Sequence, residues 1–191
     1  MRALLRDTIA IFIMAIAIFL ILQATVQSSP VVGSSMEPSL QREGQRLLIN
    51  KLAYLFHEPE RGDIITFYPP NNPKADPFIK RIIGLPGESV EIREGIVYIH
   101  KEGEVWPLDE SAYVKYPANY TYYAEIPDEH YFVLGDNRPV SNDSHHGWTV
   151  PRENIIGKAW LSIWPPSEWG LALNYPLEEQ LASSMISICL Y

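Results

Sequence analysis

The chain has 191 residues, enough for one medium-sized domain, and with 47% hydrophobic and 20% charged residues it has a globular composition. The formal net charge of −8 argues against a nucleic-acid-binding protein, which needs a basic surface to engage phosphates. The single cysteine, Cys189, excludes an intramolecular disulfide framework and a multi-cysteine metal cluster.

An unbroken apolar run occupies residues 9–22, close to the N-terminus. A helix that spans a bilayer needs about 20 mostly apolar residues, and the apolar residues flanking the run supply the remainder. Arg2 and Arg6 precede the run, and the first charge after it is Glu37. The positive-inside rule therefore predicts a cytoplasmic stub and transmembrane anchor at residues 1–26, with the rest of the chain outside.

A cleavable signal peptide is the alternative interpretation of this segment, with small residues at positions 24–29 near a cleavage point. The apolar region of a signal peptide usually has about 7–15 residues, so the length of this one favours an anchor. A buried core helix is disfavoured, because no polar face interrupts the run.

Beyond Pro30 the pattern indicates short β-strands, rich in β-branched and aromatic residues and bounded by turn formers. The predicted strands are residues 46–50, 63–68, 79–83, 89–93, 96–99 and 130–134. A hairpin is predicted at residues 91–99, and a helical pattern occurs only at residues 45–56 and 178–188. Many short strands at close intervals predict an all-β sandwich or barrel.

Composition also predicts how this domain is divided. Residues 27–175 form the expected extracytoplasmic domain, and a stretch rich in charge and tyrosine predicts an inserted, smaller β subdomain at about residues 87–130. The tail at residues 176–191 is too short to span a bilayer, and no role is predicted for it.

Three polar segments are candidates for chemistry, and the first is GSSMEP at residues 33–38. A serine hydroxyl attacks a carbonyl efficiently only when a neighbouring base removes its proton. Gly33 and Ser34 allow a tight turn before Ser35, which makes Ser35 a candidate nucleophile. By itself, a serine in a loop after a membrane helix is more often an ordinary loop residue.

The second segment is the predicted strand FIKRII at residues 78–83. Adjacent strand residues face opposite sides, so Lys80 and Arg81 cannot both point to solvent in a simple sheet. A desolvated lysine has a lowered pKa and can serve as a neutral base, whereas arginine stays protonated. The alternative is an edge strand whose lysine extends to water.

The third segment is GDNRPVSNDSHHG at residues 135–147, immediately after a buried strand. Polar residues in this place often build a site, although the same residues also make a well-capped turn. His145 and His146 suggest a metal site, but adjacent side chains diverge and the spacing matches no metal motif. We therefore expect neither a metal nor a cofactor.

Taken in order, these segments resemble the type I signal peptidases, membrane-anchored Ser/Lys proteases that remove signal peptides from exported proteins. The resemblance rests on GSSMEP at 33–38, RGDIITF at 61–67, KRIIGLPG at 80–87, and GDNR at 135–138 followed by Ser141, Asp143 and Ser144. It implies an all-β catalytic core of antiparallel sheets with an inserted second β region.

The resemblance also implies roles for individual residues. Ser35 would be the nucleophile and neutral Lys80 the general base, and the backbone N–H groups of Ser35 and Gly33 would bind the oxyanion. Ser141 would orient the lysine amine. Asp143 would pair with the residue two positions on, which here is a histidine, so that this pair would depend on pH.

Substrate would bind as an added strand beside Val31 and Ile79, in pockets that accept small side chains at the first and third positions before the cut. The implied partners are secretory preproteins and membrane lipid, and the implied location is the plasma membrane or a thylakoid membrane. Two rivals remain open: a self-cleaving Ser/Lys peptidase of the repressor type, and a membrane-tethered β interaction module without activity.

Overall fold

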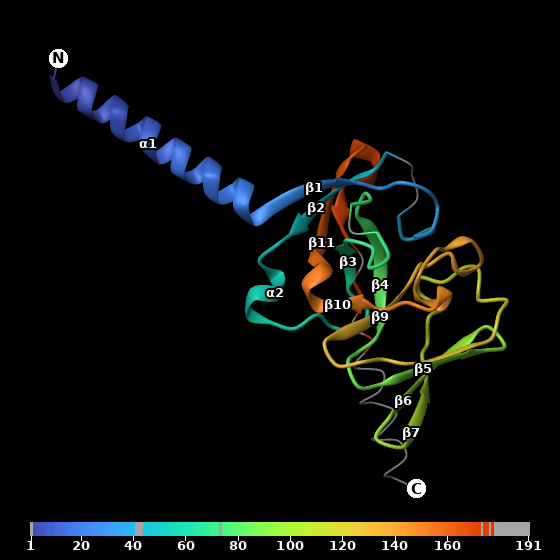
Figure 1. Ribbon diagram of the computed structural model, residues 1–191. Helices are drawn as coiled ribbons and strands as arrows, with labels where there is room; N and C mark the ends of the chain where they lie inside the picture. The colour runs from blue at the N-terminus through green and yellow to red at the C-terminus, as the bar shows by residue number, and fades with distance from the viewer. Residues whose placement is uncertain (1, 41–43, 73, 173, 176, 178–191) are drawn as a thin grey trace, which may run out of the picture.

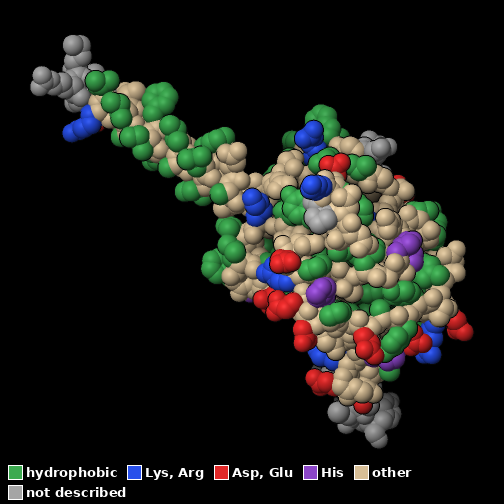
Figure 2. Space-filling view, in the orientation of Figure 1, with side chains coloured by type: hydrophobic (Ala, Val, Ile, Leu, Met, Phe, Trp, Pro, Cys, Tyr) green, Lys and Arg blue, Asp and Glu red, His purple; other side chains and the backbone are tan. Residues whose placement is uncertain are grey.

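The protein is described by a computed structural model that covers residues 2–40, 44–72, 74–172, 174, 175 and 177. Helix α1 (Arg2–Thr25) projects from a β-rich body (Figure 1), and apolar side chains cover its length (Figure 2). All side chains at positions 5–24 are exposed, and the stretch 5–25 is long and apolar enough to cross a membrane. A signal sequence meets the same criterion.

Most strands belong to one antiparallel sheet with the order β1-β2-β11-β3-β4-β9-β10, in which β12 also pairs with β11. Its strands are β1 (Val26–Pro30), β2 (Arg46–Asn50), β3 (Ile64–Phe67), β4 (Phe78–Gly84), β9 (His130–Leu134), β10 (Val150–Pro151), β11 (Ile155–Trp164) and β12 (Gly170–Leu171). The predicted antiparallel, mostly β fold with one N-terminal apolar helix is confirmed.

A smaller antiparallel sheet has the order β7-β6-β5-β8, and all of its strands lie between residues 87 and 130. They are β5 (Ser89–Arg93), β6 (Ile96–Lys101), β7 (Glu104–Pro107) and β8 (Tyr122–Glu125). Glu94 and Gly95, with φ of 52° and 80°, form the two-residue turn of the expected β5–β6 hairpin. Both residues adopt the positive φ that such hairpin turns require.

The secondary structure differs from the prediction at one expected helix and at strands that were not predicted, of which β11 is the longest. The helical pattern at residues 45–56 forms β2 and then only a short helix, α2 (Ala53–Phe56). Strand β11 lies between β2 and β3 in the sheet and pairs with both. It is missing from the prediction because its register shifts at bulges and it contains Gly157. A Cβ on Gly157 would lie 2.4 Å from the carbonyl oxygen of Asn50, so the close strand approach requires glycine.

The remaining helices are short 3₁₀ turns: η1 (Arg138–Val140), η2 (Ser144–His146), η3 (Arg152–Asn154) and η4 (Pro166–Glu168). The helix expected at residues 178–188 lies outside the described residues.

Strand β4 lies where three clusters of buried hydrophobic residues meet. Ile79 belongs to the cluster that includes residues of β2 and β11, Ile82 to the one around β3 and β10, and Ile83 to the one shared with the smaller sheet. Burial of such a side chain contributes about 1.5–3 kcal/mol. Packing on both faces therefore holds β4, and the polar residues that it carries, in one position.

Candidate active site

The structure brings Ser35 and Lys80 into direct contact, although 45 residues separate them in the chain. Lys80 lies in β4, and its Nζ donates a hydrogen bond of 2.6 Å to Oγ of Ser35, in the loop between β1 and β2. The contact is within the range in which a base takes a proton from a hydroxyl.

The loop that carries Ser35 is anchored on both sides of the serine. The N–H of Val31 donates to Gln45 O at 2.7 Å, and Met36 is 2% exposed in the hydrophobic cluster that includes residues of β2 and β11. Gly33, at φ 76°, makes the turn between these anchors, and a Cβ there would meet no atom within 4 Å. Gly33 is therefore required for its backbone conformation rather than for close packing.

The amine of Lys80 is buried, with 4% of the residue exposed, and it forms no ion pair with any described residue. Burial lowers the pKa of Lys80 from its usual 10.5 to about 8, while the carboxylates of Asp143 and Asp136 act in the opposite direction. A substantial fraction of the amine is therefore neutral in mildly alkaline solution, as a general base requires.

The turn that follows β9 forms hydrogen bonds to the loop that carries Ser35. The backbone N–H of Asn137 donates to Ser35 O at 3.0 Å, and its side-chain amide donates to Ser34 O at 3.2 Å. A Cβ on Gly135 would lie 2.4 Å from Ser35 O and 2.2 Å from Oγ of Ser141, so no larger residue fits there. This contact places the last polar segment directly beside Ser35.

The supporting residues expected from the sequence lie in this turn with different degrees of contact. Asp143 accepts hydrogen bonds from the N–H of Gly135 at 2.9 Å and from Nδ1 of His145 at 2.7 Å. The hydroxyl of Ser141 is buried and has no hydrogen-bond partner among the described residues, including Lys80.

The rings of His145 and His146 lie 3.8 Å apart rather than diverging as expected. The described part of the chain has no group of three or more His, Cys, Asp or Glu residues that could hold a metal ion, at these histidines or elsewhere.

A groove of about 610 Å³ runs past the hydroxyl of Ser35. Its lining includes both residues expected to bind substrate, Val31 and Ile79, which are 4% and 8% exposed. Most of the remaining lining is apolar, and its charged residues are Lys80 and Asp76. The remaining lining consists of Pro30, Val32, Gly33, Ser34, Ser35, Met36, Ala75, Asp76, Pro77, Phe78, Lys80, Val140 and Asn142. The groove is suited to an extended, largely apolar segment of chain.

Sequence reasoning did not single out Asn137, or Asp136 as a charge near Lys80. Both belong to a recognisable polar segment, but the direction of each side chain depends on how the turn folds against β4 and the loop of Ser35. The lining residues at positions 75–77 carried no signal of their own, because they are ordinary loop residues before the fold is known. Phe78 and Val140 lie in segments that the sequence did indicate, but no role was predicted for either residue.

Comparisons with known proteins agree on one family. The family described as "Signal peptidase, peptidase S26" matches residues 4–164. The chain is similar to the probable signal peptidase I-2 of Synechocystis sp., at 46% identity over 74% of this chain and 64% of that protein. It is also similar to the probable signal peptidase I-1 of the same organism, at 40% identity over 87% of this chain and 86% of that one. The thylakoidal processing peptidase 1 of Arabidopsis thaliana is 33% identical over 85% of this chain and 49% of the plant protein.

Proposed function

This chain belongs to the signal peptidase family, peptidase S26, and on that premise we propose that it is a membrane-bound serine endopeptidase that removes signal peptides from exported preproteins. The observation that carries the proposal is the 2.6 Å contact between the Ser35 hydroxyl and a buried lysine amine whose pKa is lowered to about 8.

The proposed reaction begins when neutral Lys80 takes the proton of the Ser35 hydroxyl as Oγ bonds to the scissile carbonyl carbon. As the C–N bond breaks, the ammonium of Lys80 gives that proton to the leaving amine. A water molecule, deprotonated by the same lysine, then attacks the acyl ester and regenerates Ser35. The lysine is thus base and acid in turn.

The oxyanion of the tetrahedral intermediate would be bound by the backbone N–H groups of Ser35 and Gly33. Within the described part of the chain, neither group has a hydrogen-bond acceptor. Unpaired donors beside a nucleophile suit a site where negative charge develops in the transition state. Ser141, whose hydroxyl is also unpaired, would orient the lysine amine, and Asp143 would hold the turn that carries it.

Substrate would lie in the groove as an extended strand between Val31 and Ile79. The walls that these residues form are apolar and limit the depth of the pockets, which would favour small side chains before the cut. Replacement of Ile79 by alanine should therefore extend cleavage to larger residues there, measured with a set of peptides that vary at these positions.

Residues 1–26 would form a cytoplasmic stub and the anchor, with the catalytic domain at residues 27–175 outside and the smaller sheet inserted at about 87–130. The plasma membrane is the proposed location, and a thylakoid membrane is the alternative, because a thylakoidal peptidase is among the relatives. Strand β1 follows the helix directly, so the site remains close to the membrane surface where a signal peptide emerges.

The decisive experiment is cleavage of a purified preprotein by the full-length chain in detergent. Ser35→Ala and Lys80→Ala should each abolish cleavage, whereas Ser167→Ala and Lys74→Ala, at exposed positions outside the groove, should not. Full cleavage by Lys80→Ala would exclude the proposed base. Fragments of the enzyme alone would instead favour a self-cleaving peptidase, and no cleavage by the wild type would favour an interaction module.

A further inference from the structure

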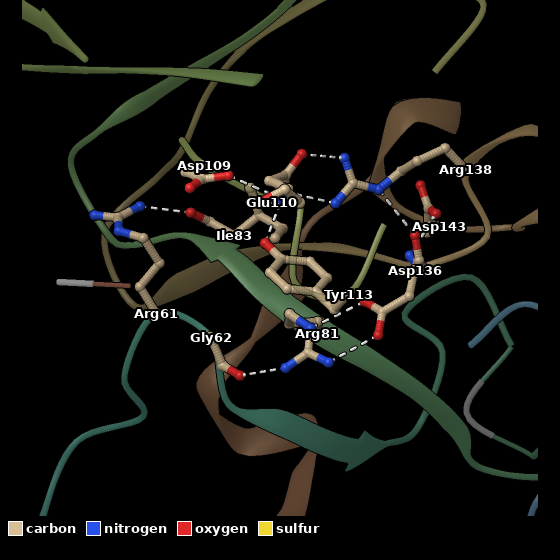
Figure 3. A network of polar contacts seen from close by, with 12 residues as sticks. Arg61, Gly62, Arg81, Ile83, Asp109, Glu110, Tyr113, Asp136, Arg138 and Asp143 are labelled. Atoms are coloured by element: carbon tan, nitrogen blue, oxygen red, sulfur yellow. Dashed lines mark hydrogen bonds and ion pairs between the residues drawn. The ribbon is translucent and has the colours of Figure 1, made fainter. Parts of the chain in front are cut away.

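A buried ion pair connects the segment after β7 to the turn that supports Ser35 (Figure 3). Arg138 donates from Nη1 to Oε2 of Glu110 at 2.8 Å and from Nη2 to Oε1 at 2.7 Å. Arg138 is fully buried and Glu110 is 8% exposed. The two parallel hydrogen bonds fix the guanidinium in both position and orientation.

The same guanidinium reaches the catalytic turn directly. Nε of Arg138 donates a hydrogen bond of 2.9 Å to the carbonyl of Gly135, the residue that packs against Ser35 O and Ser141 Oγ. A single side chain, that of Arg138, therefore links the carboxylate of Glu110 to the backbone that supports the nucleophile.

A second branch leads from Glu110 towards the strand of the lysine. The hydroxyl of Tyr113 donates to Oε1 of Glu110 at 2.8 Å, and the guanidinium of Arg81 lies 4.3 Å from the centre of the Tyr113 ring. Arg81 in turn binds both carboxylate oxygens of Asp136, at 2.9 and 2.7 Å. Asp136 is one of the two carboxylates that influence the amine of Lys80.

We propose that Glu110 is a positioning residue for catalysis: from the segment between β7 and β8 it holds Arg138, and through it the Gly135 turn, in the arrangement that presents Ser35 to Lys80. The inference rests on the proposed Ser/Lys mechanism and adds to it a residue that touches neither the groove nor the reacting atoms. It gives the smaller sheet's connecting segment a function in catalysis.

The chain contains a second buried Arg–Glu pair. Arg61 binds Glu88 through Nη2, at 2.7 and 2.8 Å to the two carboxylate oxygens, and both residues are as buried as the first pair. Arg61 also donates to the carbonyl of Ile83 in β4, whereas Arg138 donates to the carbonyl of Gly135 in the turn after β9. A purely structural role predicts the same consequences from loss of either pair.

The test replaces each pair by apolar residues of similar volume in the full-length protein, as Glu110→Leu with Arg138→Met and as Glu88→Leu with Arg61→Met. Such replacement of a whole buried pair is often tolerated by a fold. We expect kcat for preprotein cleavage to fall about 10- to 100-fold in the first variant, because small misplacement of reacting groups is costly, with KM nearly unchanged. In the second variant kcat should fall clearly less than in the first, because its guanidinium does not bind the carbonyl of Gly135. Equal kcat in the two variants would overturn the proposal.

Glu110→Gln provides a second measurement if the double variant does not fold. It retains the shape of the side chain and removes the carboxylate that pairs with the Arg138 cation, leaving Asp136 as the remaining negative charge that acts on it. The kcat should therefore fall, and the acid limb of the pH–rate profile should move to lower pH. An unchanged kcat and profile would contradict the inference. Activity of Ser35→Ala in the same assay would instead refute the proposed mechanism itself, so the two failures are distinguishable.

Discussion

Lys80 and Arg81 are neighbours on β4, and the structure buries both cations on opposite sides of the strand, at 4% and 0% exposure. Arg81 donates hydrogen bonds to both carboxylate oxygens of Asp136 and to the carbonyl of Gly62, whereas Lys80 donates one to the hydroxyl of Ser35. One side of β4 therefore compensates its charge fully, and the other leaves the amine with a neutral partner.

This difference in charge compensation suits Arg81 to stabilising the fold and Lys80 to proton transfer. A buried guanidinium with a bidentate carboxylate keeps its proton and holds segments together. A buried amine without an ion-pair partner has a lowered pKa and becomes able to exchange a proton. Adjacent positions on one strand can thus serve the fold and the reaction independently.

The largest expected effect comes from making the two positions alike. Lys80→Arg retains a cation but not a base, because a guanidinium is not deprotonated in proteins. We expect kcat for preprotein cleavage to fall by about 1,000-fold or more. Circular dichroism of the variant checks that the fold is retained. Activity within tenfold of the wild type would show that the amine at position 80 is not the base.

The opposite change removes the compensated cation. Arg81→Met leaves the carboxylate of Asp136 buried without its partner, which should destabilise the protein by about 3–5 kcal/mol in urea unfolding. Arg93→Met is the control, because Arg93 is about half exposed and its contact with Glu91 should contribute less than about 1 kcal/mol. Equal effects of the two variants would refute the assigned difference between them.

The pH dependence of activity tests the other side of β4. Because Lys80 must be neutral and its pKa is about 8, kcat/KM should rise about tenfold per pH unit below that value and level off above it. Initial rates of preprotein cleavage between about pH 6 and 10 measure this limb. A flat profile across that range would contradict a lysine base.

Stability should respond to the same group with a smaller effect. The pKa of Lys80 is about 8 in the folded protein and 10.5 as its usual value, so between these values the unfolded chain binds more protons. Wild-type stability should therefore rise with pH in this window relative to Lys80→Met, and the full cost of burying the charged amine remains below about pH 8. At pH 7 the variant should be more stable, by at most about 3 kcal/mol. A difference independent of pH in urea unfolding would contradict the lowered pKa.

Local patterns made several features predictable. The apolar run at the N-terminus forms α1, and the alternation of apolar residues in β4 predicted that one of its two cations faces the interior. The apolar run and the alternation are signals that a short stretch of residues carries by itself. The pairing of Ser35 with Lys80 came instead from the resemblance of several segments, taken in order, to a known family.

Other features had no such signal. Strand β11 contains bulges and a glycine, so its sequence lacks regular alternation although it lies inside the large sheet. Glu110 reads as one of many charged residues in a tyrosine-rich segment. Its burial against Arg138 depends on contact between residues 28 positions apart.

The sequence by itself determined that two adjacent cations occupy one apolar strand, that a helix long enough to span a membrane precedes a β domain, and which residue types could do the chemistry. Only the tertiary structure decided which cation is compensated. The alternation along β4 does not indicate which side of the strand faces a carboxylate. The carboxylate of Asp136, 55 residues away in the chain, binds Arg81. On the other side of the strand, the hydroxyl of Ser35, 45 residues away in the chain, accepts a hydrogen bond from Lys80. The physical reason is that burial and charge compensation are set by contacts between distant segments, which local sequence patterns do not encode.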